Sequence, residues 1–246
     1  MLYWAKTPKG PIIGLVPTAT LFTGPDPFKD QYVFVNNYPK RIQQNGGVPI
    51  GLVSVDGNLP PQALEVCQGF LLCGGGKLWP YHMQVISHAM ARHKPLLGIC
   101  LGMQAICAWY QVQAEARRRG FAGEAADLFQ TMKEERFMFN LPVEGHWPVP
   151  ITRDNTEETK HPVAIFPGTL LHTLLGQDQA WGSSLHHYRV NGLAPGLIQC
   201  AATSDGTIEG IEAGPDVLGV QFHPEVEENL CALFRHLVCR AGMAAR

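Results

Sequence analysis

Short apolar runs alternate with helical patterns through the first half of the chain. The apolar runs cover residues 11–17, 48–53, 69–73 and 96–99, and the helical patterns cover residues 32–45 and 83–93. Strands that alternate with helices are typical of a parallel sheet that is covered on both faces and connected by right-handed crossovers. Asn45-Gly46-Gly47 is a helix-ending signal, and Pro60-Pro61 opens a short segment before the third strand. The first half therefore predicts an α/β fold.

The pattern changes after residue 110. Residues 111–136 are charged, rich in alanine and helical in pattern, and short strands return over residues 163–166, 197–202, 207–212 and 217–222. Asp205-Gly206 lies between two of these strands and predicts a hairpin turn. No internal repeat, low-complexity tract or long linker interrupts the chain, so we expect residues 1–246 to form a single domain. We expect the charged segment 111–136 to be a solvated helical hairpin, with a lid or a dimer contact as the alternatives.

Composition narrows the class of partner. The 246 residues are 46% hydrophobic and 16% charged, which is typical of one large globular domain with a sizeable core. The formal net charge of -2 gives no electrostatic reason to expect nucleic acid or an anionic membrane surface as a partner. A small-molecule substrate fits this composition better.

The first residues and the cysteines indicate a cytoplasmic protein. Residues 1–18 lack the basic start, apolar region and small-residue cleavage site of a signal peptide, and no apolar stretch is long enough to span a bilayer. The seven cysteines are scattered over positions 67, 73, 100, 107, 200, 231 and 239 with no CxxC pair. Reduced thiols are the simplest interpretation, and a zinc site is not expected.

One cysteine, Cys100, occupies a predicted strand-to-helix corner. Residues 95–99 predict a buried strand, Gly102 follows, and residues 103–109 predict the start of a helix. A side chain at this corner points out of the carboxyl edge of the sheet, and its backbone lies near the unpaired N–H groups of the first helical turn. That environment favours a thiolate, so Cys100 is a candidate nucleophile.

A cysteine nucleophile needs a base, a partner that orients the base, and donors for the oxyanion. His223 ends a predicted strand, and the proline after it turns the chain so that Glu225 can reach back to one ring nitrogen. Two backbone N–H groups are candidates for the oxyanion. Gly75 lies in the glycine run 74–76 that follows a buried strand, and Leu101 comes directly after the cysteine.

Each of these signals has a more ordinary explanation. A cysteine at a strand end is more often a small buried hydrophobe, a glycine run is usually a loop, and a histidine beside an acid commonly forms a cap or a salt bridge. Their joint occurrence is informative because all three features would lie at the same carboxyl edge of one parallel sheet. We therefore interpret them together as a catalytic centre.

The same residues carry a family resemblance. Gly98-Ile99-Cys100-Leu101-Gly102-Met103-Gln104, together with Gly219-Val220-Gln221-Phe222-His223-Pro224-Glu225, closely resembles the class I glutamine amidotransferase superfamily. The resemblance implies a flavodoxin-like α/β fold, in which a central, mostly parallel sheet is flanked by helices and accompanied by a small antiparallel sheet. It also implies that Cys100 is the nucleophile, His223 the general base and acid, and Glu225 the orienting carboxylate. Gln104 would contact the α-amino-acid end of the substrate.

Other segments resemble one branch of this superfamily, the γ-glutamyl-γ-aminobutyrate hydrolase family. They cover residues 32–49, 161–171, 184–188, 193–197 and 205–209. The segment around residue 184 falls in a loop beside the active site in that family. The resemblance therefore adds Ser184, Leu185 and His186 to the candidate substrate-binding residues, and Gly74 of the glycine run is a further candidate.

The chain departs from the family pattern at three places. Leu101 stands where the family usually has an arginine, Gly76 is not followed by an acidic stretch, and the charged segment 111–136 stands where a short loop is usual. All three departures lie around the expected mouth of the pocket. They bear on the identity of the substrate more than on the type of reaction.

The reaction implied by the resemblance is hydrolysis of a γ-glutamyl amide. Cys100 would attack the side-chain carbonyl to form a γ-glutamyl thioester, and water would then release glutamate, with no metal or organic cofactor. The amine released could be ammonia, a polyamine, γ-aminobutyrate or an amino acid. Two alternatives remain: a glutaminase subunit that passes ammonia to a synthetase partner, and a catalytically inactive binding protein. A homodimer is compatible with each of these, and neither nucleic acid nor a membrane is expected as a partner.

Overall fold

A computed structural model describes residues 10–21, 24 and 26–244 of the chain. Residues 1–9, on which part of the signal-peptide expectation rests, lie outside the described residues. Within the described part, no helix combines the length and the apolar character needed to cross a membrane.

A central sheet organises the described residues, and its strand order is β4-β1-β5-β6-β13-β12-β11-β8-β9. The first five strands are parallel: β4 (Val48–Gly51), β1 (Ile12–Val16), β5 (Gly69–Leu72), β6 (Leu96–Ile99) and β13 (Val217–Val220). The other four continue the sheet with antiparallel neighbours: β12 (Ile208–Ala213), β11 (Ile198–Ala202), β8 (Lys160–Ile165) and β9 (Gln179–Ser183). Two small antiparallel ribbons stand beside it, β2 (Thr18–Thr20) with β3 (Gln31–Val33), and β7 (Asn140–Pro142) with β10 (Tyr188–Val190). This confirms the predicted α/β fold with a mostly parallel central sheet and a small antiparallel sheet.

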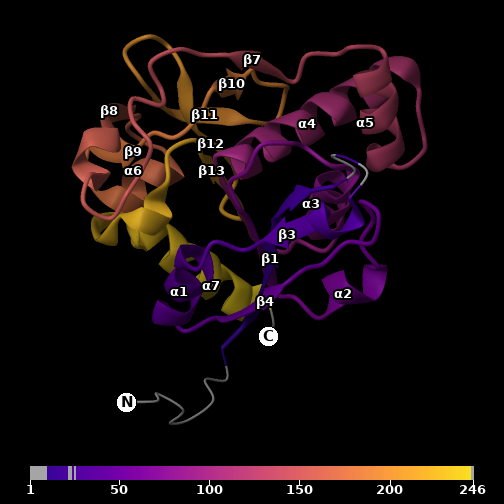
Figure 1. The fold of residues 1–246 in the computed structure, drawn as a ribbon, viewed down its shortest axis with the longest axis horizontal. Helices are drawn as coiled ribbons and strands as arrows, with labels where there is room; N and C mark the ends of the chain where they lie inside the picture. The colour runs from indigo at the N-terminus through magenta and orange to yellow at the C-terminus, as the bar shows by residue number, and fades with distance from the viewer. Residues whose placement is uncertain (1–9, 22–23, 25, 245–246) are drawn as a thin grey trace.

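Helices cover the two faces of the sheet. Figure 1 shows α3 (Pro80–Ala91), α4 (Leu101–Arg119) and α5 (Ala125–Glu134) together on one side, and α1 (Asn37–Gln44), α6 (Leu170–Leu175) and α7 (Ala232–Ala244) on the other. The short helix α2 (Pro61–Glu65) connects β4 to β5. Side chains of β5 alternate between the faces, so that Phe70 and Leu72 join the core under α3 and α4 while Leu71 joins the core under α1 and α7. Both faces of the sheet are therefore buried from solvent, and the inner parallel strands are apolar along their whole length.

Two helix predictions need correction. The helix predicted over residues 32–45 begins only at Asn37, because residues 31–33 form β3 and pair with β2. Val33, Phe34 and Val35 are β-branched or aromatic residues, which favour extended backbone over helix. The helix predicted over residues 83–93 begins three residues earlier, at Pro80, a residue well suited to the first helical turn.

The charged segment 111–136 is helical but is not simply solvated. Its first part continues α4 through Arg119, and its second part is α5. One face of α5 is buried against α3 and α4, with Phe129 completely inaccessible and Leu128 nearly so. The charged residues occupy the opposite side, where Arg119 pairs with Glu135. The expectation of a solvated hairpin is therefore wrong for half of this segment, because its apolar residues recur at helical spacing and complete the core.

Candidate active site

Cys100 lies at a tight corner between β6 and α4. Its φ of 53° and ψ of -108° are values that favour glycine, and its side chain is buried. Two glycines allow the helix to approach the sheet this closely. A Cβ on Gly102 would lie 2.1 Å from the carbonyl oxygen of Leu72, and a Cβ on Gly98 would lie 2.6 Å from the backbone of Gly102. The corner thus fixes the thiol at the carboxyl edge of the sheet.

His223 follows β13, the strand next to β6, and is oriented by Glu225. The distance from His223 Nδ1 to Glu225 Oε1 is 2.7 Å, and both side chains are buried. The geometry fits an Nδ1–H that donates to the carboxylate. The other ring nitrogen, Nε2, is buried and makes no hydrogen bond of ordinary geometry with any described residue. It is therefore available to the proton of Cys100.

The electrostatics of this pair favour a charged imidazole. Burial by itself lowers the pKa of His223, but the negative charges of Glu225 and of a Cys100 thiolate raise it, and the net result lies well above the ordinary value of 6.5. A histidine that holds its proton at neutral pH stabilises a neighbouring thiolate. The arrangement can therefore support a thiolate–imidazolium pair.

Gly74 lies where three side chains of the site meet. A Cβ at Gly74 would lie 2.9 Å from His223 Cε1, 3.0 Å from the Tyr38 hydroxyl and 3.5 Å from Cys100 Cβ. The Gly74 N–H donates to the Tyr38 hydroxyl oxygen over 3.0 Å. Burial, together with the charge of Glu225, raises the pKa of Tyr38 well above its ordinary value, so this hydroxyl stays protonated. Only glycine fits at this position.

The two predicted oxyanion donors, Gly75 and Leu101, line the same cavity as Cys100. The Leu101 N–H precedes the helical hydrogen-bond ladder, whose bond at this corner runs from Gln104 N–H to the Cys100 carbonyl over 3.1 Å. Gly75 is exposed and follows Gly74 at the end of β5. Because the N–H of Gly74 already donates to Tyr38, it is the N–H groups of Gly75 and Leu101 that remain as donors for a ligand.

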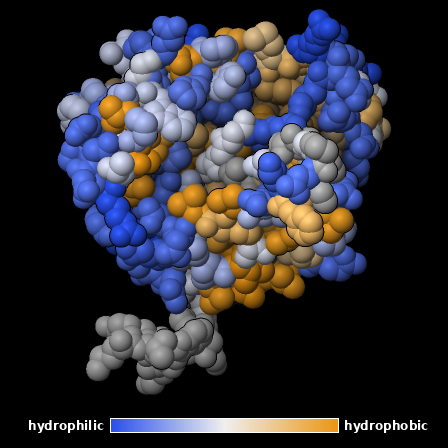
Figure 2. Space-filling view, in the orientation of Figure 1, coloured by the Kyte–Doolittle hydropathy of each residue, from blue (hydrophilic) through white to orange (hydrophobic). Residues whose placement is uncertain are grey.

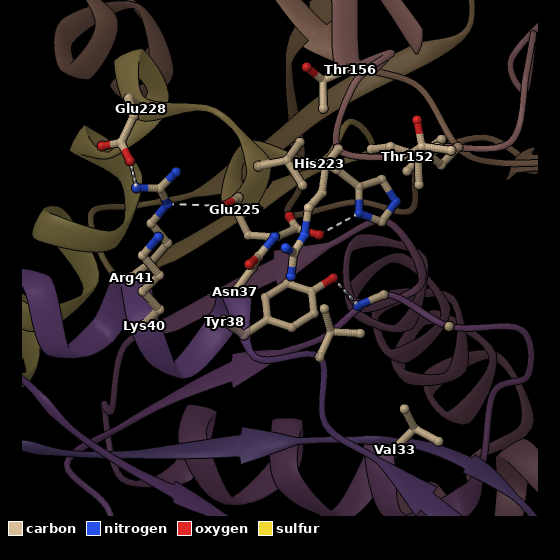
Figure 3. A pocket seen from close by; sticks show the side chains of 17 residues that line it. Val33, Asn37, Tyr38, Lys40, Arg41, Thr152, Thr156, His223, Glu225 and Glu228 are labelled. Atoms are coloured by element: carbon tan, nitrogen blue, oxygen red, sulfur yellow. Dashed lines mark hydrogen bonds and ion pairs between the residues drawn. The ribbon is translucent and has the colours of Figure 1, made fainter.

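Two cavities meet at this centre. The smaller has a volume of about 270 Å³ and is lined by residues that include Cys100, Leu101 and Gln104. The larger has a volume of about 760 Å³, and His223 and Glu225 are among its lining residues. Figure 3 shows its lining, with Tyr38, Lys40 and Arg41 of α1 on one side and Thr152 and Thr156 on the other. Gly75 and Leu185 line both cavities, so the two spaces share a boundary beside the thiol.

Gln104, predicted to contact substrate, is largely committed to the protein. Its amide nitrogen donates to the Tyr188 carbonyl over 3.0 Å and to Gln221 Oε1 over 3.1 Å, and its oxygen accepts from Asn140 Nδ2 over 2.9 Å. It lines the smaller cavity and holds the two strands of the β7–β10 ribbon against α4. The structure therefore places Gln104 as part of the cavity wall.

The loop 184–187, predicted to bind substrate, contributes unequally to the cavities. Leu185 lines both, and His186 lines the smaller one. Ser184 is buried behind the wall, where its hydroxyl donates to the His146 carbonyl over 2.7 Å. Ser184 therefore shapes the loop and does not reach the cavity surface.

Several residues of the site could not be found from motifs. Tyr38 contacts the centre from α1, Trp147 lines the smaller cavity and stacks on His187, and Arg41 donates from Nε to the Glu225 carbonyl oxygen over 3.0 Å. The aromatic residue in the first turn of α1 was the only available signal for Tyr38. The other two carry no motif because their partners are distant in sequence.

Comparison with known proteins gives the class of this chain. A family model described as Peptidase C26 matches residues 80–225. Protein NtpR of Enterococcus hirae is 28% identical over 243 residues, which cover 88% of this chain and 91% of NtpR. CTP synthase of Chlamydia felis is 28% identical over 183 residues, which cover 70% of this chain and 33% of that protein. The crystal structure of a glutamine amidotransferase from Thermotoga maritima has a TM-score of 0.60 at 13% identity, covering 94% of this chain and 98% of that one.

Fold and family model together define a cysteine-dependent hydrolase of the glutamine amidotransferase type, within the class I glutamine amidotransferase superfamily. Inside that class, the chain belongs to the Peptidase C26 family.

Proposed function

We propose that this protein hydrolyses a γ-glutamyl amide without a synthetase partner, releasing glutamate and an amine. The observation that carries the proposal is the buried His223–Glu225 pair, whose Nε2 makes no hydrogen bond of ordinary geometry with the described residues, beside Cys100 and at the wall of a large cavity. A proton taken from the thiol can be passed to a group that leaves toward that cavity.

The reaction would proceed in two halves. His223 Nε2 takes the proton of Cys100, and the thiolate attacks the γ-carbonyl carbon while the N–H groups of Gly75 and Leu101 stabilise the oxyanion. The imidazolium returns its proton to the amine nitrogen as the C–N bond breaks, which leaves a γ-glutamyl thioester and the free amine. Water then gives a proton to Nε2 and attacks the thioester, and the Cys100 thiolate leaves as glutamate forms. Glu225 keeps the imidazole oriented in both halves.

The two cavities support a division of the substrate at the scissile bond. The smaller cavity contains Cys100 and has a volume suited to the γ-glutamyl group. The larger is lined by His223, the proposed proton donor to the leaving group. A cavity of about 760 Å³ is far larger than ammonia needs, which favours an amine conjugate over glutamine. Val33 and Val35 line this cavity and are exposed, so they add apolar surface to it. Figure 2 shows hydrophobic surface in the region of β3 and β4.

The charges around the larger cavity favour an amine that also carries a carboxylate. Arg41 is paired with Glu228 over 2.7 Å, and Glu225 is paired with His223. Two further cations, Lys40 and Arg153, line the same cavity, and neither forms an ion pair with a described residue. The cavity therefore carries excess positive charge, which suits γ-aminobutyrate or an amino acid better than a polyamine.

The alternative of a glutaminase subunit is favoured by one observation, the similarity to CTP synthase over 70% of this chain. That function requires a partner and predicts glutamine as the substrate. The third hypothesis, an inactive binding protein, does not explain the arrangement of Cys100, His223 and Glu225. It is therefore the least favoured of the three functions.

The test is glutamate release from a substrate panel, measured by mass spectrometry on the purified protein alone. The panel contains glutamine, γ-glutamyl-γ-aminobutyrate and γ-glutamylputrescine, with a Cys100→Ser variant as the inactive control. We expect release from the carboxylate-bearing conjugate, and a severalfold higher KM for it in a Lys40→Gln/Arg153→Gln double variant. Release from γ-glutamylputrescine alone would overturn the charge argument. Silence with every conjugate, together with glutamine hydrolysis that appears only when a partner is added, would favour the glutaminase subunit.

A further inference from the structure

A completely buried carboxylate, Glu209 on β12, lies among three histidines outside the Cys100 centre. Glu209 Oε1 is 3.4 Å from His146 Nδ1 and 3.3 Å from His186 Nε2, and its Oε2 is 3.6 Å from His161 Nε2. His146 Nδ1 and His186 Nε2 are 3.2 Å apart. Among the described ion pairs, Glu209 faces no lysine or arginine.

The outer nitrogens of two of these histidines already have acceptors. His146 Nε2 lies 3.1 Å from Asp205 Oδ2, and His186 Nδ1 lies 3.0 Å from the carbonyl oxygen of Tyr188. An acceptor at the outer nitrogen holds the ring proton there. The inner nitrogens of His146 and His186 then present lone pairs, and both face the Glu209 carboxylate.

Several inner atoms of the cluster are buried without a partner. Neither oxygen of Glu209 nor the Nε2 atom of His161 makes a hydrogen bond with the described residues. Facing acceptors in a buried site repel one another and lose their hydration, which is costly unless a cation lies between them. The cation must be either shared protons on the imidazoles or a metal ion.

We propose that His146, His161 and Glu209 bind a divalent transition-metal ion of the Zn²⁺ type, with His186 as the fourth ligand. The ligand atoms of the first three lie within 4.8 Å of one another. Zn²⁺ bound tetrahedrally at 2.0–2.1 Å has edges of about 3.3 Å between its ligand atoms. The separations among Glu209 Oε1, His146 Nδ1 and His186 Nε2 are 3.2, 3.3 and 3.4 Å, and His161 Nε2 lies 3.6 Å from the other carboxylate oxygen. Three imidazoles and one carboxylate are a donor set that suits zinc.

The hydrogen bonds around the cluster also fit this assignment. Metal-binding histidines usually donate their second ring N–H to a carboxylate or a backbone carbonyl, which fixes the ring and its tautomer. His146 has such a partner in Asp205, and His186 has one in the Tyr188 carbonyl. The ligands are dispersed between positions 146 and 209 and form no short metal-binding motif. The sequence therefore gave no indication of this site.

The ion would join parts of the chain that form the wall of the smaller cavity. His161 lies on β8 and Glu209 on β12, whereas His146 and His186 lie on two loops that line or support that cavity. Leu185, next to His186, separates the two cavities. The proposed role is therefore to fix these loops, and no step of the hydrolysis passes through the ion.

Metal binding is tested separately from catalysis in the full chain carrying Cys100→Ser. We expect one Zn²⁺ per chain by elemental mass spectrometry, and visible absorption of tetrahedral Co²⁺ when the chelator-treated protein is titrated with Co²⁺. Thiolate ligation would add a strong near-ultraviolet charge-transfer band, which a site of three nitrogens and one oxygen lacks. Absence of the tetrahedral Co²⁺ absorption would overturn the proposal and leave shared protons as the cation.

Variants locate the site. We expect His161→Asn and Glu209→Gln to weaken Co²⁺ binding at least about 100-fold, and Asp205→Asn to weaken it roughly 10- to 100-fold through the orientation of His146. The matched control is His172→Asn, because His172 also pairs with an aspartate, at 2.9 Å from Asp178, but lies outside the cluster. Circular dichroism identifies variants that do not fold. If Glu209→Gln does not fold, the metal affinity of His161→Asn still tests the site, because His161 is only partly buried. Equal affinity of His161→Asn and His172→Asn would refute the assignment.

Discussion

At the scale of single residues, the 2.7 Å contact between His223 and Glu225 sets the protonation of the site. The pKa of His223 lies above its ordinary 6.5, so the charged imidazole persists into a higher pH range than in a free histidine. By linkage, the stabilisation from this pair is fully present below about pH 6.5 and is lost as the pH rises through the raised pKa. The proposed catalytic pair therefore also contributes to the pH dependence of stability.

Glu225→Gln should lower kcat by roughly 100-fold or more, because the imidazole loses both its orientation and its charge partner. The pKa of His223 should fall, so the alkaline limb of the kcat/KM profile should move to lower pH. The free energy of unfolding of the native chain should exceed that of Glu225→Gln by the largest amount below about pH 6.5. The difference between the two should become smaller at higher pH. Glu157→Gln, which removes an exposed carboxylate paired with Lys160, is the control. An unmoved alkaline limb would mean that another group governs it.

Gly102 offers a second test, of the corner that holds the thiol. Gly102→Ala should destabilise the fold by at least about 2 kcal/mol, because a Cβ would lie 2.1 Å from a backbone oxygen that cannot move aside. Gly242→Ala in α7 is the matched control, since its Cβ would meet no neighbouring atom and should stabilise by about 0.4–1 kcal/mol. Urea unfolding measures both. Equal stability of the two variants would show that α4 can withdraw from the sheet.

At the scale of elements, α5 is the clearest case in which packing decides the role of a segment. Its charged residues suggested a solvated hairpin, yet the opposite face completes the core beside α3. Phe129→Ala should therefore cost about 3–5 kcal/mol. Phe121→Ala, in the connection before α5 and 39% exposed, should cost less than about 1 kcal/mol. If chemical unfolding gives the two variants the same stability, α5 is not part of the core.

The sequence predicted the buried strands of the central sheet better than the short strands of the small ribbons. β5 and β6 were found because strands covered on both faces are continuously apolar. The hairpin of β11 and β12 was found because Asp205-Gly206 forms its turn, with Gly206 at a φ of 82°. The β2–β3 ribbon was missed because a three-residue strand has too few positions to show alternation.

The residues of the candidate site also fall into those that the sequence predicted and those that it did not. Cys100, His223 and Glu225 stand in two short motifs, so local spacing was enough to single them out. Tyr38 reaches the centre only because α1 packs beside the end of β5, and Glu209 and the three histidines around it converge from separate segments. Contacts of this kind depend on the tertiary arrangement, which residue spacing does not encode.

At the scale of the whole molecule, one sheet runs continuously from β4 to β9 with a hydrophobic core on each face. β5 and β6 contribute side chains to both cores, so neither core can be lost alone without exposing the other. We predict a single cooperative thermal transition, seen at the same temperature by far-ultraviolet circular dichroism and by tryptophan fluorescence. Two separated transitions would show that the parallel and antiparallel parts of the sheet unfold independently.

The backbone of Cys100 has a consequence for the stability of the fold. A residue with a side chain in such a conformation strains the fold by about 1–3 kcal/mol. Glycine at this position would relieve the strain but would also remove a buried thiol from the core on this face of the sheet. The proposed nucleophile therefore occupies a backbone position at which any side chain lowers the stability of the fold.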